Sequence, residues 1–327
     1  MTTVSRTHDA NPVHIQFDDN NLLPLVFGAH DKHLVRIEQQ LGVSLVARGN
    51  RIAISGPSDA ATTAGAALRS LYSQVRDGEL LNDGDVDAAV RMAQTARPDE
   101  GGGDNRTMIH LHRKRIAARS AAQSRYIQAM RESSMVFALG PAGTGKTYLA
   151  VCAAVELFSA GKVDRIILSR PAVEAGERLG FLPGDMQEKI DPYLRPLFDA
   201  LHDTLPGDQV VRRLSSGEFE VAPLAFMRGR TLTNAFVILD EAQNTTATQM
   251  KMFLTRLGEN SRMVITGDLS QVDLPPGTRP GLRDAVETLA DVPGISFVRF
   301  SDADVVRPPL VARIIRAYDA AESGKKK

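Results

Sequence analysis

Short apolar runs and longer runs with helical spacing follow one another along most of this chain. The short runs have the length and composition of buried strands and lie at 134–139, 165–169, 235–239, 263–265 and 295–300. The longer runs place apolar residues three and four positions apart, which predicts helices at 120–132, 148–158 and 186–201. Because strands that alternate with helices form parallel sheets, we expect an α/β domain with a parallel sheet over 109–320.

The first part of the chain has a different order of elements. Its apolar pattern predicts a helix, a hairpin of two strands and a second helix, at 32–41, 43–48, 51–55 and 59–75. The two strands flank Gly49-Asn50, and a Gly-Asn pair is a standard hairpin loop because glycine tolerates a positive φ. The order predicts a small α+β module at 16–78.

Three stretches are predicted to be flexible or connecting. Residues 79–108 are acidic and then glycine-rich, so we expect the linker between the two domains there. Residues 1–15 are expected to be a flexible lead-in and residues 321–327 a flexible tail.

The most informative stretch is G-P-A-G-T-G-K-T at 140–147, which fits the phosphate-binding pattern G-x-x-x-x-G-K-[ST]. A predicted strand precedes it and a predicted helix follows it, so bound phosphates would meet the positive end of the helix dipole. The alternative is a glycine-rich turn with an incidental lysine. Such a turn would not require a strand before it and a helix after it. The candidate nucleotide-binding residues are Gly140, Pro141, Ala142, Gly143, Thr144, Gly145, Lys146, Thr147 and Tyr148. Gln123 joins them, because helicase-like P-loop proteins use a glutamine ahead of this loop to recognise adenine.

A second chemical motif ends the apolar strand at 235–239. Asp240 and Glu241 follow that strand directly, and we expect Asp240 to hold Mg²⁺ together with the Thr147 hydroxyl. Glu241 is placed to take a proton from the attacking water, which favours an ATPase over a small-molecule kinase. The pair could also cap a following helix at Thr245 or Thr246.

The predicted strand at 263–265 leads to T-G-D-L-S-Q at 266–271. Strand ends of a parallel sheet meet at one edge, so these side chains are expected beside the γ-phosphate. Asp268 and Gln271 are candidate sensors that couple hydrolysis to motion. The polar stretch after the strand at 165–169 is expected to border the same site.

Charge and cysteine content narrow the setting. Lys+Arg and Asp+Glu are equal at 39 each, so any basic surface must be local. Cys152 is the only cysteine, which suits a reducing compartment, and its place on the helix after the loop predicts a small core residue. The first residues lack an apolar signal core and no run has the length of a membrane span, so we expect a cytoplasmic protein without membrane contact.

Two features are compatible with RNA binding, and each has a plainer alternative. The basic cluster at 110–115 could contact RNA phosphates or could be a solvated edge. The module at 16–78 resembles a KH-type RNA-binding domain, in which a GXXG loop clamps the nucleic-acid backbone. Here Asp31 holds the fourth position of that loop, so a docking or assembly role is equally open. His30 and His33 are expected to be ordinary surface residues.

Several motifs together resemble the PhoH-like ATPase family over roughly residues 105–320. They are G-P-A-G-T-G-K-T at 140–147, S-R-P-A-V-E-A-G-E-R-L-G-F-L-P-G-D at 169–185, D-E-A-Q-N at 240–244, T-G-D-L-S-Q at 266–271 and D-V-V-R at 304–307. The resemblance implies a RecA-like P-loop NTPase domain that hydrolyses ATP with Mg²⁺, roles in RNA metabolism, and ring-shaped oligomers such as hexamers. A KH-like front module suits the same family. The chain departs from the pattern at Pro308, where relatives have a histidine, and RNA cleavage is not expected.

Helicases of the related type close ATP between two RecA-like domains, and an arginine of the second stabilises the transition state. The chain has room for one such domain, so we expect a homo-oligomer in which a neighbour supplies Arg307, with Arg313 and Arg178 as further candidates. The resulting prediction is an RNA-associated ATPase or helicase-like remodeller, with RNA or an RNA-processing protein as partner. The alternative is a nucleotide-gated adaptor that binds protein or ribosomal partners.

Overall fold

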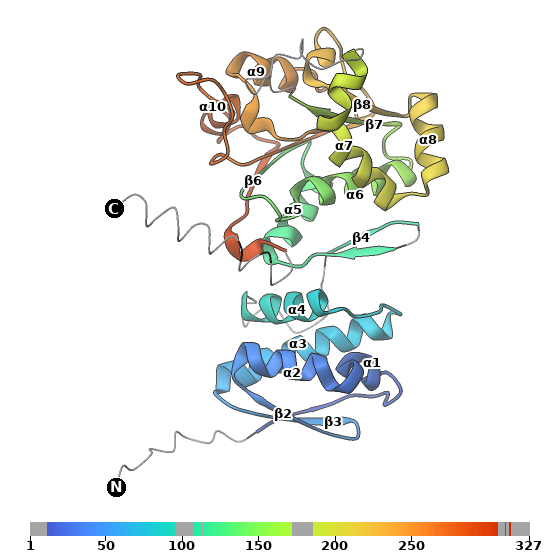
Figure 1. The fold of residues 1–327 in the computed structure, drawn as a ribbon, viewed down its shortest axis with the longest axis vertical. Coiled ribbons are helices and arrows are strands. Elements are labelled where there is room, and N and C mark those ends of the chain that lie inside the picture. The colour runs from blue at the N-terminus through green and yellow to red at the C-terminus, as the bar shows by residue number, and fades with distance from the viewer. Residues whose placement is uncertain are drawn as a thin grey trace. The chain divides into compact units, whose positions relative to one another are not determined.

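The computed structural model describes residues 12–95, 107–112, 114–171 and 186–306, together with 311 and 314 (Figure 1). The chain divides into two compact units. The first contains residues 1–106, 119–121 and 310–327, and the second contains 107–118 and 122–309. Within the described ranges, no helix is both long enough and apolar enough to cross a membrane.

The first unit is an α+β structure with a three-stranded antiparallel sheet. Strands β1 (Val13–Gln16), β2 (Ser44–Arg48) and β3 (Arg51–Ser55) pair in the order β1-β3-β2. The helices α1 (Leu23–Phe27), α2 (Lys32–Leu41), α3 (Ser58–Arg76) and α4 (Asp83–Thr95) lie on one side of this sheet in Figure 1. The predicted hairpin and the two predicted helices are confirmed. Strand β1 was not predicted, although its V-H-I-Q alternation buries Ile15 opposite Ile52.

Helix α4 lies inside the stretch that the sequence predicts to be a linker. Its buried residues are Val86, Ala88, Ala89 and Val90. Helix α4 packs on α2 and α3, and Asp87 accepts hydrogen bonds from Arg36 at 2.5 and 2.6 Å. The acidic residues between its apolar positions give this segment the composition of a connecting stretch.

One prediction for the first unit is wrong. His33 is buried, with 2% of its surface exposed, and its Nδ1 lies 2.9 Å from the carbonyl oxygen of Val26. The ring fits beneath the loop because Gly28 has no side chain, since a Cβ there would lie 2.8 Å from the imidazole. Hence His33 is a core residue of this unit.

The second unit contains a six-stranded parallel sheet in the order β11-β6-β10-β9-β7-β8. The strands are β6 (Met135–Leu139), β7 (Arg165–Arg170), β8 (Phe219–Pro223), β9 (Ala235–Leu239), β10 (Arg262–Gly267) and β11 (Ile295–Arg299). The predicted α/β fold with a parallel sheet is confirmed. Strand β8 was not predicted, because its F-E-V-A-P sequence has no continuous apolar run.

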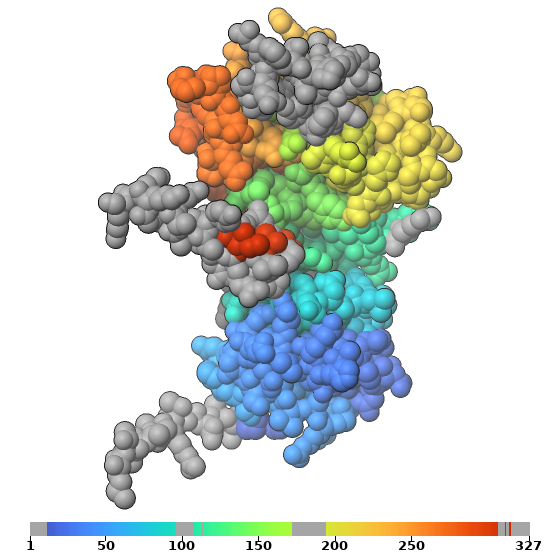
Figure 2. All heavy atoms as spheres, in the orientation of Figure 1, coloured from blue at the N-terminus to red at the C-terminus, as the bar shows by residue number. Residues whose placement is uncertain are grey.

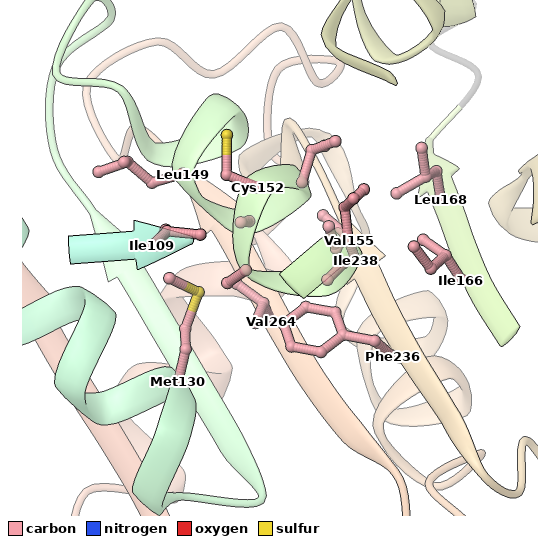
Figure 3. Packing of buried hydrophobic residues seen from close by; sticks show 14 of the residues in the cluster. Ile109, Met130, Leu149, Cys152, Val155, Ile166, Leu168, Phe236, Ile238 and Val264 are labelled. Atoms are coloured by element: carbon pink, nitrogen blue, oxygen red, sulfur yellow. The ribbon is translucent and has the colours of Figure 1, made fainter. Parts of the chain in front are cut away.

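Helices cover both faces of this sheet, which explains why its strands are continuously apolar. They are α5 (Ala121–Glu132), α6 (Lys146–Ser159), α7 (Met186–Thr204), α8 (Gly207–Ser216), α9 (Ala247–Leu254) and α10 (Gly281–Thr288). Successive strand residues enter two different hydrophobic cores: Phe236 lies in the first core and Val237 in the second. Figure 3 shows the first core, in which Cys152 and Val155 of α6 lie over Ile238 and its neighbours. Helices α8 and α10 form outer surfaces of the unit, in yellow and orange in Figure 2.

Cys152 is fully buried, so its predicted place in the core is confirmed. A short antiparallel hairpin of β4 (Met108–His110) and β5 (Arg115–Ala117) also belongs to this unit. It carries the predicted basic cluster, whose Arg113 lies outside the described residues. The Nζ of Lys114 donates to Asp203, so this cation is paired.

Candidate nucleotide-binding site

The loop between β6 and α6 has the backbone of a phosphate cradle. Three of its glycines have positive φ angles: Gly140 at 145°, Gly143 at 82° and Gly145 at 83°. Residues with side chains rarely adopt these angles, so the loop depends on glycine. At Gly140 a Cβ would also lie 2.4 Å from the carbonyl oxygen of Phe300. The loop ends where α6 begins, which directs free backbone N–H groups and the positive helix end toward a bound anion.

The ammonium group of Lys146 lies within this loop. Its Nζ donates to the carbonyl oxygens of Gly140 and Pro141 at 2.7 and 2.8 Å. Burial lowers the pKa of Lys146, and nearby carboxylates oppose this shift. Those carboxylates belong to Asp268, Asp240 and Glu241. A phosphate anion at the loop would stabilise the buried cation directly.

The side chains expected to hold magnesium are in direct contact. The Thr147 hydroxyl donates to Oδ1 of Asp240 at 2.7 Å, and Thr266 donates to the same oxygen at 2.5 Å. Asp240 is 4% exposed. A threonine hydroxyl beside a buried carboxylate is the oxygen donor set that Mg²⁺ uses with nucleotide phosphates, so these residues fit the ion.

Glu241 follows Asp240 in a left-handed conformation, with φ at 52°. Its Oε1 accepts a hydrogen bond from Arg170 at 2.8 Å, and its Oε2 accepts one from Gln243 at 2.5 Å. Helix α9 is capped by Thr246, whose hydroxyl accepts from the Gln249 N–H. The acidic pair therefore does not cap that helix. The two carboxylates lie after the carboxyl end of β9, at the same end of the parallel sheet as the loop after β6.

The two candidate sensors lie in different environments. Asp268 is 8% exposed, and its Oδ1 accepts hydrogen bonds from the N–H and hydroxyl of Ser270. Its Oδ2 is buried without a hydrogen-bond partner among the described residues. Gln271 is exposed and donates its backbone N–H to the Asp268 carbonyl at 3.2 Å. Asp268 is thus part of the buried site, whereas Gln271 lies at its surface.

Gln123 and Tyr148 flank the loop in sequence, one before it and one after it. Gln123 is buried and donates to the carbonyl oxygen of Thr144 at 3.0 Å, so it contacts the loop backbone itself. The Tyr148 hydroxyl donates to Asp203 at 2.8 Å and lies 3.0 Å from Lys114 Nζ. Burial raises the pKa of Tyr148. These contacts connect the hairpin and α7 to the start of α6.

Some predicted residues lie outside the described part of the chain. These are Arg178, Arg307 and Arg313, together with most of the motif at 169–185. The described residues before Arg307 do reach the loop, because the Val306 N–H donates to the Gly143 carbonyl at 2.9 Å.

Three site residues lie in stretches that were expected at or beside the site, but no individual role was predicted for them: Arg170, Gln243 and Thr266. Each lies close in sequence to a predicted residue, at the end of β7, two positions after Glu241 and two positions before Asp268. The signal was their position at the carboxyl ends of adjacent parallel strands, where polar side chains converge. The sequence alone did not specify which side chains touch.

A glycine-dependent loop between a buried strand and a helix, with its lysine and a threonine–aspartate pair, defines a P-loop nucleotide-binding protein. The model of the PhoH-like protein family matches residues 115–319 of this chain. A PhoH-like protein of Bacillus subtilis (strain 168) is 50% identical over 296 residues, which cover 90% of this chain and 93% of that protein. The chain belongs to the PhoH-like protein family.

Further relatives agree with this assignment. A PhoH-like protein of Synechocystis sp. is 44% identical over 298 residues, which cover 90% of this chain and 91% of that protein. Protein PhoH of Escherichia coli (strain K12) is 49% identical over 205 residues, which cover 62% of this chain and 58% of that protein. The similarity to the first of these extends through both units.

Proposed function

We propose that this chain binds ATP with Mg²⁺ and hydrolyses it, with Glu241 as the general base. The observation that carries the proposal is the hydrogen bond of Thr147 to Asp240 at 2.7 Å, with Glu241 as the next residue. This arrangement brings a hydroxyl–carboxylate pair, which we assign to Mg²⁺, and a second carboxylate to the carboxyl-terminal end of the parallel strands. A carboxylate in that position can accept a proton from water, a contribution of about 10²–10⁴ in rate.

Each residue has a distinct role in this proposal. The backbone N–H groups of the loop and the Lys146 ammonium bind and orient the phosphates. Mg²⁺, held through Thr147 and Asp240, would neutralise charge on the phosphate oxygens. Glu241 would hold the proton of the attacking water. We assign adenine recognition to Gln123. The assignment rests on its contact with the loop backbone and on the family resemblance.

A homo-oligomer forms part of the proposal. Phosphoryl transfer benefits from an arginine at the transition state, worth about 10³–10⁵ in rate in other NTPases. The described residues place Arg170 at the site but pair it with carboxylates, at 2.8 Å from Glu241 and 3.5 Å from Asp240. We infer that a second copy of this chain supplies the arginine, with Arg307 as the first candidate.

We also propose that the ATPase acts on RNA or with an RNA-processing protein in the cytoplasm. The antiparallel sheet and helices of the first unit, and the basic residues on the β4–β5 hairpin, support an RNA partner. A nucleotide-gated adaptor for protein or ribosomal partners is the second candidate. It is favoured by Asp31, whose exposed carboxylate in the glycine loop would repel phosphate.

RNA-dependent ATP hydrolysis separates these two functions. Turnover of the full chain is measured with and without single-stranded and structured RNA, beside the Lys146→Ala variant. The RNA-associated ATPase predicts turnover that rises with RNA in the wild type and is absent in the variant. Hydrolysis that no RNA stimulates would support the adaptor.

A further inference from the structure

Both carboxylate oxygens of Glu241 are held by side-chain donors. Arg170 reaches one oxygen from the end of β7, and Gln243 reaches the other from the turn after β9. The Glu241 side chain is 40% exposed, so its burial does not by itself fix its rotamer. Its orientation therefore depends on the two donors and on its left-handed backbone.

Gln243 is itself fixed at both ends of its amide. It is 1% exposed, and its Oε1 accepts the Asp268 N–H at 3.1 Å. Because that oxygen must be the acceptor, Nε2 is the end that faces Glu241. The close approach requires Gly267, since a Cβ there would lie 2.9 Å from Oε1. Gln243 thus connects Glu241 to the end of β10.

Arg170 is held by the sheet rather than by a loop. It is the last residue of β7, whose Ser169 pairs with Leu239 of β9 and accepts the Asp240 N–H at 2.9 Å. The Arg170 side chain is 18% exposed and lies 3.5 Å from Oδ2 of Asp240. The guanidinium consequently faces two consecutive carboxylates from a rigid strand end.

We propose that Arg170 and Gln243 are positioning residues, which hold the Glu241 carboxylate in the orientation that hydrolysis requires. The inference rests on the proposed role of Glu241 as the base. A partly exposed glutamate without these donors would populate several rotamers. A misplacement of about 1 Å in a reacting group can cost about 10²-fold in rate. Neither residue needs to touch the nucleotide.

The test measures kcat, KM and nucleotide affinity for ATP hydrolysis by the full chain. Arg170→Ala and Gln243→Ala are each expected to lower kcat by about 10–100-fold. KM and the affinity for ATP should stay within about threefold of the wild type, because phosphate binding is intact. Arg170→Lys, which keeps a charged donor, should recover part of the loss. Arg165→Ala, at the other end of β7, is the matched control and should turn over normally.

A double variant separates positioning from other roles. If Arg170 acts through Glu241, adding Arg170→Ala to Glu241→Gln should change the residual rate by less than about threefold. If the double variant instead loses rate by the product of the two single losses, the inference is overturned, because Arg170 would then act on the substrate or the fold. A melting temperature measured for each variant identifies unfolding. Should Arg170→Ala fail to fold, Gln243→Ala and Arg170→Lys carry the same comparison.

Failure of this inference differs from failure of the proposed function. Wild-type turnover by Glu241→Gln would remove Glu241 as the base, and the positioning role with it. Slow turnover by Glu241→Gln with wild-type kcat for both Arg170→Ala and Gln243→Ala would overturn the positioning role alone.

Discussion

The hydroxyl of Thr147 donates to Oδ1 of Asp240 at 2.7 Å, which joins the first turn of α6 to the end of β9 across the intervening strand β10. Thr266 of β10 donates to the same oxygen. Side chains from α6, from β10 and from the residue after β9 therefore meet at one carboxylate oxygen, where the proposed metal ion would bind.

Substitution of that carboxylate tests the metal site. Asp240→Asn should weaken the Mg²⁺-dependent part of ATP binding by at least about 10-fold, because a neutral amide is a poor ligand for a hard cation. The measurement is ATP affinity with Mg²⁺ and with a chelator. The wild type should bind more tightly with Mg²⁺, and the variant should show little difference. An unchanged Mg²⁺ effect in the variant would refute the assignment.

The buried ammonium of Lys146 gives a second prediction. Lys146→Ala should reduce ATP affinity by more than about 10-fold, because it removes a charge-assisted contact to phosphate. ATP should raise the melting temperature of the wild type by mass action and leave that of the variant unchanged. Lys162→Ala, an exposed lysine beyond the end of α6, is the matched control. Equal ATP-induced shifts in all three proteins would contradict the site.

The ion pair of Arg36 with Asp87 should make the first unit sensitive to acid. Burial raises the pKa of Asp87, but the hydrogen bonds from Arg36 and Gln40 outweigh it, so the folded-state pKa is lowered. A lowered pKa stabilises the fold above the unfolded-state value, about 3.9, and the contribution is lost as the pH falls through the folded-state value.

Asp87→Asn should accordingly cost about 1–2 kcal/mol at pH 7 and little at pH 2. The measurement is urea unfolding of the full chain, monitored by the protection of backbone amides in α4 from hydrogen exchange. Lys32→Gln provides the control, because the pair of Lys32 with Asp83 is exposed and should be worth less than about 0.5 kcal/mol. Equal losses for the two variants at pH 7 would argue against a larger contribution from the partly buried pair of Arg36 with Asp87.

Cys152 should be unreactive in the folded protein. Burial raises the pKa of its thiol to about 12, so almost no thiolate is present at pH 8. Iodoacetamide should alkylate the thiol only after the protein is denatured, as measured by mass spectrometry. Native-state alkylation at the rate of a free thiol would show that the helix opens or that the core is looser than described.

The sequence predicts the sheet well because its strands are buried on both faces. Runs such as 235–239 are continuously apolar, and the G-K-[ST] pattern locates the loop without tertiary information. Strand β8 and helix α4 were not predicted, since their partly polar sequences are stabilised by packing on other elements, on β7 for the strand and on α2 and α3 for the helix. His33 shows the same limit, because its burial depends on Gly28 and on the Val26 carbonyl.

The sequence predicted which stretches of the chain form the candidate site, but not all of its residues and not their contacts. The pattern predicted that Thr147 and Asp240 act together on Mg²⁺, and in the structure the two side chains share a hydrogen bond. Asp268 and Gln271 stay predicted sensors, and the side chain that connects Glu241 to the end of β10 is that of Gln243, for which no role was predicted. Gln243 and Gln271 are both polar residues near a strand end, and Gly267 allows the close approach of Gln243, because a Cβ there would lie 2.9 Å from Oε1 of Gln243.

The central claim, that Glu241 is the base of an ATP-hydrolysing site, is tested most directly by single-turnover hydrolysis of Mg²⁺-ATP by Glu241→Gln. The wild type should hydrolyse ATP, and the variant should be slower by about 10²–10⁴-fold while its ATP affinity stays within about threefold. A variant that binds ATP and hydrolyses it at the wild-type rate would contradict the claim.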